Sequence, residues 1–152
     1  MTRKFAPGLR AALAAGMVLL AGDAARVAAA PHHAEYKPAP GEGVICSLAT
    51  YALVEEVGAR CMAGQDPELQ SEIHRAVARL DAYVLHNSKW TPLDLVRFKI
   101  EQAHVGGDEA FLCHGDPLRM YQAFRAADPA RIRAEMDRLL SRPGEPSWGV
   151  CY

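Results

Sequence analysis

The sequence predicts an all-α domain, a small disulfide-stabilised bundle of about five helices that run mostly antiparallel. Between Val44 and Leu140, apolar residues recur at spacings of three and four, and no long segment alternates in the manner of a strand. Four positions combine a helix-capping residue with a proline that follows it directly. All four cysteines lie after residue 45, which provides for two disulfides.

The first thirty residues have the three parts of a secretory signal peptide, which is expected to comprise residues 1–29. Basic residues open the segment, residues 11–22 are small or aliphatic, and residues 23–30 are more polar and rich in Ala. A helix made of that apolar stretch would cover about 18 Å, well short of the ~30 Å hydrocarbon core of a membrane, which argues against an uncleaved anchor. Small residues favour cleavage after Ala29, with cleavage after Ala30 as the alternative.

Cleavage after Ala29 leaves 123 residues, of which 13 are basic and 17 acidic, for a net charge near −4. This charge is unfavourable for nucleic-acid binding, which rests largely on the neutralisation of phosphates. No second apolar run of membrane-spanning length follows, so no stable membrane insertion is expected. The high Ala and Arg content with few Lys suggests a GC-rich bacterial genome, and the mature protein is therefore expected to be periplasmic or secreted.

The mature chain is expected to begin with an extended lead-in, residues 30–43, which is rich in Pro and poor in apolar groups. A single helical domain, residues 44–152, follows it. The expected helices cover residues 44–62, 67–86, 92–105, 117–126 and 129–141. The apolar segment 108–113 is left without an assignment.

Four of these helix starts share one sequence device. A capping side chain accepts a hydrogen bond from a backbone amide that has no partner within the helix, and a proline in the first helical position loses no bond there. The predicted pairs are Asp66–Pro67, Thr91–Pro92, Asp116–Pro117 and Asp128–Pro129. Asp94 lies three residues after Thr91 and completes a capping box.

The third expected helix differs from the others because it is apolar on more than one side. Leu93, Val96 and Ile100 are expected to point into the core, which leaves Phe98 beside Leu95 on the flank. A helix packed centrally between its neighbours would bury both sets. The alternative is an exposed stripe that binds a partner or a lipid.

Geometry limits how the four cysteines can pair. Cys46 and Cys61 are 15 residues apart, about 22 Å along one helix, so they cannot bond to each other. If consecutive helices run antiparallel, Cys113 lies at the same end as Cys61. The last helix would also end there, but the ten residues from Ser141 to Cys151 can span roughly 33 Å and return to Cys46. We expect the disulfides Cys61–Cys113 and Cys46–Cys151, and the wide gaps disfavour a zinc site.

Two pairs of residues have the spacing of metal ligands. Glu101 and His104 form an E-x-x-H pair, but di-iron bundles need a second such pair, and this chain has none. His32 and His33 would suit a copper or nickel site at the N-terminus if cleavage followed Ala30, a site that cleavage after Ala29 would disrupt. Whether a surface metal site exists at either pair stays open, and no metal is predicted.

Cys113, His114 and Asp116 form the remaining group with catalytic side chains. A general base needs a partner nucleophile and an orienting group, and oxidised cysteines would not supply the nucleophile. Asp116 is interpreted as a helix cap instead. No catalytic or cofactor-binding residue and no cofactor is therefore predicted.

These observations predict a non-enzymatic exported protein that binds another exported protein, as an inhibitor, immunity protein, adaptor or chaperone. The chain has no motif for phosphate, dinucleotide or nucleophilic chemistry, and a rigid disulfide-held helical surface suits protein recognition. The alternative is a small carrier of a lipid or another apolar ligand bound between the helices. The identity of the partner and the oligomeric state stay open.

Overall fold

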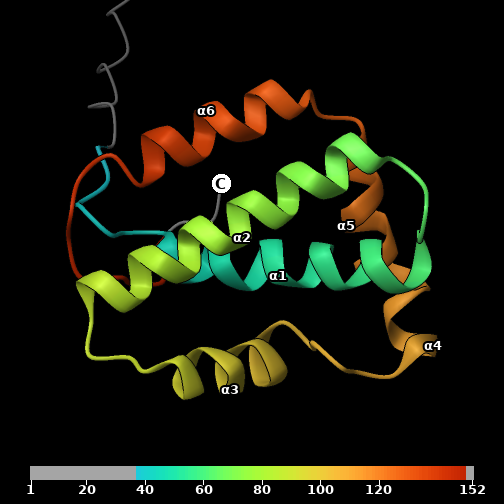
Figure 1. The fold of residues 1–152 in the computed structure, drawn as a ribbon, viewed down its shortest axis with the longest axis horizontal. Coiled ribbons are helices and arrows are strands. Elements are labelled where there is room, and N and C mark those ends of the chain that lie inside the picture. The colour runs from blue at the N-terminus through green and yellow to red at the C-terminus, as the bar shows by residue number, and fades with distance from the viewer. Residues whose placement is uncertain (1–36, 150–152) are drawn as a thin grey trace, which may run out of the picture. The chain divides into compact units, whose positions relative to one another are not determined.

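The computed structural model describes residues 37–149, which form an all-α bundle as predicted. The helices are α1 (Val44–Cys61), α2 (Pro67–Asn87), α3 (Pro92–Gln102), α4 (Glu109–Leu112), α5 (Gly115–Arg125) and α6 (Pro129–Leu139). α3 and α6 lie on opposite sides of the α1–α2 pair (Figure 1). Within the described part of the chain, no helix is long and apolar enough to cross a membrane. The predicted signal peptide, its cleavage site and the His32–His33 pair lie outside these residues.

α1 is the central helix of the bundle. The five consecutive residues Val44–Leu48 are all buried, and they cover a full helical turn. The helix contacts α2, α3, α4 and α5. A helix that is apolar all round is a buried one. The broad apolar face expected for this helix is therefore only part of what it buries.

α2 runs antiparallel to α1, as predicted. The amide of Gln70, near the start of α2, donates to the carbonyl of Met62 just after the end of α1, at 2.9 Å. One turn later, His74 Nδ1 lies 2.6 Å from Glu55 Oε1, which is earlier in α1. The two helices therefore pass each other in opposite directions, and the apolar face of α2 packs on α1.

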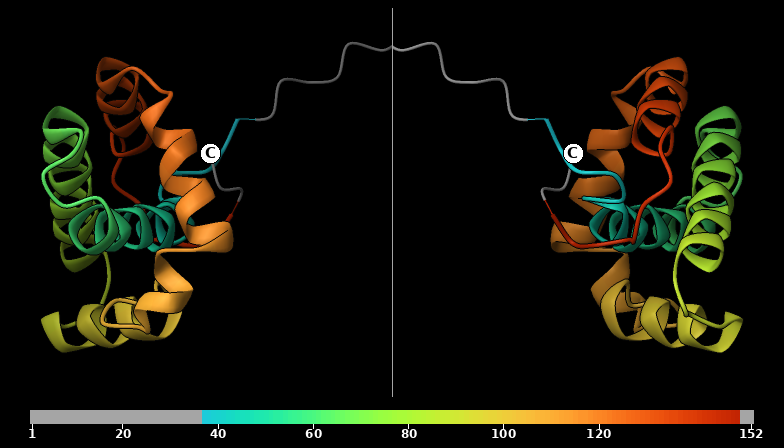
Figure 2. Two further views of the ribbon diagram at one scale, coloured as in Figure 1. Left: turned by 90° about the vertical axis from the view of Figure 1, so that its right-hand side faces the viewer. Right: turned by 90° about the vertical axis from the view of Figure 1, so that its left-hand side faces the viewer.

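α6 runs in the same direction as α2, which corrects the strictly alternating order used to place the last helix. Successive contacts advance along both helices together: Arg133 with Glu72 at 2.7 Å, Asp137 with Arg79 at 2.8 Å, and the Arg142 carbonyl with the Tyr83 hydroxyl at 2.8 Å. The reason is α5, which is short and crosses the bundle at one end instead of running its length (Figures 1 and 2). α6 therefore finishes at the end where α1 begins.

The lead-in before α1 and the tail after α6 meet at this end of the bundle, where backbone hydrogen bonds join them. Ser147 donates to the Gly41 carbonyl at 3.0 Å, and its own carbonyl accepts from Ile45 at 3.2 Å. A Cβ on Gly144 would lie 2.4 Å from the Pro40 carbonyl oxygen, so this close approach requires glycine. The lead-in was expected to be extended, but residues 40–43 form a turn that packs against the tail.

Two of the four predicted caps are confirmed. Thr91 and Asp94 form the capping box at the start of α3, and Asp128 Oδ1 accepts from the Ala130 amide at 2.8 Å at the start of α6. Asp66 is not a side-chain cap, which corrects that prediction. Its backbone is left-handed, with φ at 49°, and its carboxylate binds Arg125 Nε at 3.0 Å instead.

The predicted cap at Asp116 is also wrong. α5 begins at Gly115 with His114 as its N-cap, so Asp116 lies inside the first turn and forms an ion pair with Arg119. Pro117 is compatible with this start because the first four amides of a helix have no partner within it. The helix can therefore begin two residues before the proline.

The end of α3 and the segment between α3 and α5 also differ from what was expected. α3 ends at Gln102 and not at residue 105, because His104 and Gly106 adopt left-handed backbone conformations, with φ at 53° and 76°. The unassigned segment 108–113 contains α4, which Asp108 caps by accepting from the Ala110 amide at 3.3 Å.

Candidate protein-binding surface

α3 packs on the bundle with the face opposite to the one predicted. Leu95 and Phe98 are buried, whereas Leu93, Val96 and Ile100 are 65%, 54% and 55% exposed. The expectation that the latter three point into the core is therefore wrong. Periodicity could not choose between the two sets, because each of them fits a helical spacing.

The three exposed residues form one continuous stripe. At 100° per residue, Leu93, Val96 and Ile100 fall within about 60° of one another and lie opposite Phe98 on the helix. We call this set the α3 stripe. It is the exposed face of α3, and the helix itself lies on the side of the molecule remote from α6 (Figure 2).

The inner face of α3 is held by aromatic packing and one ion pair. The Phe98 ring packs against two tryptophan rings, with ring centroids 5.3 Å from Trp90 and 5.9 Å from Trp148. Lys99 Nζ lies 2.5 Å from Asp81 Oδ2 on α2. The other carboxylate oxygen of Asp81 is buried without a hydrogen-bond partner, so Lys99 is the residue that compensates this charge.

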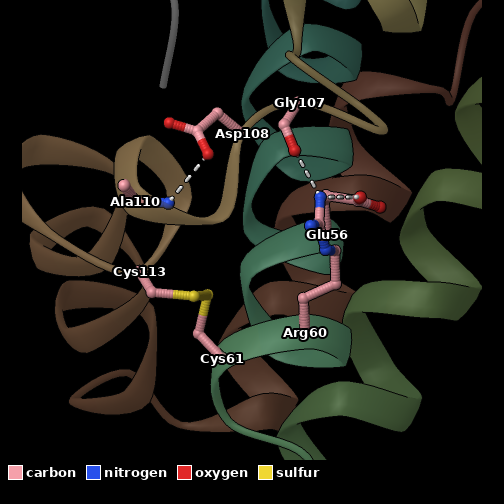
Figure 3. The surroundings of a disulfide bond; sticks show 7 residues. All are labelled: Glu56, Arg60, Cys61, Gly107, Asp108, Ala110 and Cys113. Atoms are coloured by element: carbon pink, nitrogen blue, oxygen red, sulfur yellow. Dashed lines mark hydrogen bonds and ion pairs between the residues drawn. A yellow bond between two sulfur atoms is a disulfide. The ribbon is translucent and has the colours of Figure 1, made fainter.

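Both ends of α3 are also fixed. The capping box of Thr91 and Asp94 closes the first turn, and the hydrogen bonds from Thr91 hold the pKa of Asp94 below its usual range. After the last turn, Arg60 on α1 donates to the Gly107 carbonyl at 2.5 Å, and Glu56 accepts from the Gly106 amide at 2.9 Å. These contacts position the loop that leaves α3 (Figure 3).

A disulfide closes the same end of the bundle. It joins Cys61, the last residue of α1, to Cys113 just after α4, with the two Cα atoms 5.3 Å apart (Figure 3). This is one of the two disulfides predicted from the antiparallel order of consecutive helices. Cys151 lies outside the described residues, so its bond to Cys46 stays a prediction. Because Cys61 and Cys113 bond to each other, Cys151 is the one cysteine of the chain left for Cys46.

The chain segment that follows α3 is acidic. Between Lys99 and Arg119 the chain has four carboxylates and no Lys or Arg. Three of these carboxylates, on Glu101, Asp108 and Glu109, belong to exposed residues at the end of α3 and the start of α4. Phe111 is 46% exposed in the same region, and its ring centroid lies 4.7 Å from that of His104.

The residues considered as metal ligands are not brought together. Glu101 lies in α3, but His104 lies beyond the end of α3 with a left-handed backbone, so the two do not share a helical face as expected. His104 instead packs on Phe111. Among residues 37–149, no three His, Cys, Asp or Glu side chains are grouped as metal ligands.

The residues considered as a catalytic group, Cys113, His114 and Asp116, have structural roles instead. Cys113 is in the disulfide, His114 is the exposed N-cap residue of α5, and Asp116 is paired with Arg119. A disulfide sulfur cannot act as a thiolate nucleophile. This arrangement gives no nucleophile–base pair at this position.

One buried charge links α2 to α6. Glu72 is 3% exposed, and its Oε2 accepts from Arg75 at 2.6 Å and from Arg133 at 2.7 Å. Burial alone would raise the pKa of Glu72, but the two guanidinium groups outweigh it and hold the pKa below its usual range. An open groove of about 620 Å³ next to this pair is lined by acidic and basic side chains alike. It has no excess of either charge that would select an ionic ligand.

The α3 stripe is the feature that sequence reasoning placed wrongly. The signal that could have oriented α3 is Phe98, because a large aromatic residue close to Trp90 in sequence buries more apolar surface than Val96 does. Comparison with known proteins gives no further guide, since no family model, no curated protein and no solved structure matches this chain.

Proposed function

We propose that this chain is an exported, non-enzymatic protein that binds another protein through the α3 stripe. The supporting observation is the stripe itself, in which Leu93, Val96 and Ile100 are each more than half exposed. Exposing apolar side chains to water is unfavourable, and adjacent ones on a surface are typical of protein interfaces. Burying them against a partner would lower the free energy.

The anchoring of α3 supports the same function. The helix is fixed by Phe98 on its inner face, by the Thr91–Asp94 capping box at its start and by the Arg60 contact near its end. A surface that is already ordered loses little conformational entropy when it binds, which favours affinity. An inhibitor, immunity protein, adaptor or chaperone would benefit from such a preformed surface.

Export is part of the proposal and has two supports. The first 29 residues have the pattern of a signal peptide, and the Cys61–Cys113 disulfide is a bond that persists in oxidising compartments. Both are compatible with a periplasmic or extracellular protein. N-terminal sequencing of the exported protein would test it, with Ala30 as the expected first residue.

The test of binding uses one disruptive variant and one matched control. Val96→Asp places a charge in the stripe, whereas Ala134→Asp places the same charge on an exposed position of α6. We expect a protein from the producing cells to co-purify with the wild type and with Ala134→Asp, and to be lost with Val96→Asp. Retention by all three would reject the stripe as the binding surface.

The carrier function makes a different prediction for the same sample. Native mass spectrometry of a loaded lipid carrier would show a mass excess of a few hundred daltons. The binding proposal expects the mass of the bare mature chain and, when the partner is present, the mass of the complex. A small-molecule excess that survives Val96→Asp would favour the carrier.

A further inference from the structure

We infer that the partner contributes a helical segment that is apolar on one face and carries Lys or Arg at the end lying over the C-terminal end of α3. This inference rests on the proposed function and adds the chemistry of the partner to it. Its basis is the distribution of charge around the α3 stripe.

Charges of both signs border the stripe, but exposed carboxylates gather at only one end of it. Asp94 in the first turn is held in the capping box, and Lys99 in the last turn is paired with Asp81. Exposed Lys89 precedes the helix, and exposed Arg97 lies at its middle, beside Leu93. The end of the helix leads to Glu101, Asp108 and the rest of the acidic segment. A partner segment that covers the whole stripe therefore meets negative charge at the C-terminal end of α3.

Two further observations favour a cation at the second end. The last carbonyl groups of a helix carry partial negative charge, which adds to the carboxylates near the C-terminus of α3. Arg60, a basic residue that contacts this loop, is already paired with Glu56 at 3.4 Å and with the Gly107 carbonyl. The negative charge of Glu101 and Glu109 is thus available to an incoming Lys or Arg.

A second copy of this chain fits the stripe less well. Two α3 helices related by a two-fold axis can face each other antiparallel or parallel. The antiparallel pair is centred near residue 96 and would set the two copies of Arg97 opposite each other. The parallel pair would bring the two acidic ends together. The antiparallel pair also brings Lys89 of each copy toward the acidic end of the other, but it opposes the two copies of Arg97 at its centre. A different protein that carries cations only at one end avoids both repulsions and is favoured.

The direct test uses two synthetic helical peptides of about 18 residues, long enough to populate a helix when bound. Both have a leucine stripe, and they differ in carrying lysines or glutamates at one end. In low salt we expect the lysine peptide to bind about tenfold more tightly than the glutamate peptide. Methyl NMR signals of Leu93, Val96 and Ile100 should shift on binding.

Two pairs of variants locate the effect. The double substitution Glu101→Gln and Glu109→Gln should bring the two affinities close together, and it leaves the caps of α3 and α4 intact. The control pair Glu68→Gln and Glu145→Gln removes the same charge at exposed positions outside the acidic segment, and it should keep the tenfold preference. Circular dichroism of each variant checks that the fold is retained.

Each outcome separates this inference from the proposed function. Val96→Asp could abolish the binding of both peptides while the wild type binds the two with equal affinity. That result would keep the stripe as a binding site and overturn the inferred charge. Binding that ignores Val96→Asp would overturn both. Val96-dependent binding to anionic phosphatidylglycerol vesicles in place of the peptides would identify a lipid surface. A Val96-dependent doubling of the mass in solution would identify a second copy, and either result would reject the inferred partner.

Discussion

α1 and α3 both have apolar residues on more than one side, but the bundle treats them differently. α1 is surrounded by α2, α3, α4 and α5, and residues on every side of it are buried. α3 buries Leu95 and Phe98 and leaves three apolar residues in water. The difference shows that the same kind of pattern can be buried by the fold in one helix and remain exposed to water in another.

Removing the disulfide that joins the end of α1 to the residue after α4 is expected to have the largest effect on stability and on the difference between α1 and α3. Replacing Cys61 and Cys113 by Ala opens a loop with a sequence separation of 52 residues, which contains α2 and α3. In the chain-entropy model this should lower the free energy of unfolding by about 4 kcal/mol. Urea denaturation measures the loss. Amide exchange should accelerate more in α3 than in α1, and equal acceleration would show that the bond does not fix the end of α3.

The second prediction compares the same substitution in the two helices. Leu48 in α1 is fully buried, whereas Leu93 in α3 is 65% exposed. Leu48→Ala should reduce the free energy of unfolding by about 3 kcal/mol through lost burial and a cavity. Leu93→Ala should change it by less than about 0.5 kcal/mol. Equal losses in urea denaturation would mean that the α3 stripe is covered within the chain.

The third prediction tests how α3 is held on α2. Lys99→Met removes the partner of Asp81 and leaves a partly buried carboxylate without compensation. We expect a loss of about 1 to 2 kcal/mol, because neither side chain is fully buried. The double variant Lys99→Met with Asp81→Asn should recover part of it. If the double variant were less stable than the single one, the ion pair would not be the cause.

The comparison also shows what the sequence could and could not predict. The all-α class and the start of α3 depend on local signals, namely helical periodicity and the Thr91–Asp94 box, and both predictions are confirmed. The predicted cap at Asp116 is wrong because α5 begins at Gly115, which places Asp116 inside the first turn. The predicted cap at Asp66 is wrong because a tertiary contact decides it. Asp66 is drawn to Arg125 on α5, a partner distant in sequence.

The predicted orientation of α3 is wrong for a related reason. A helix with two apolar faces has two ways to pack, and the choice depends on which neighbours it meets. Phe98 finds Trp148 in the tail, about 50 residues later, and no local pattern reports that contact. The candidate site was therefore predicted as a possible exposed stripe, but with the two faces of the helix exchanged.

The smallest expected effect concerns the capping box that starts α3. Thr91→Ala removes the hydroxyl that accepts from the Asp94 amide, and it should cost about 1 kcal/mol at neutral pH. The box also depends on pH, because hydrogen bonds from Thr91 lower the pKa of Asp94 in the folded protein. The unfolded chain then binds the proton more readily than the folded one. The contribution of the carboxylate is fully present above the ordinary pKa of Asp, about 3.9, and is lost as the pH falls through the lower folded value. Asp94→Asn at neutral pH should therefore reproduce the behaviour of the wild type in acid, with faster amide exchange in the first turn of α3 and unchanged exchange in α1. Slower exchange in that turn on acidification, after correction for intrinsic rates, would contradict the assignment.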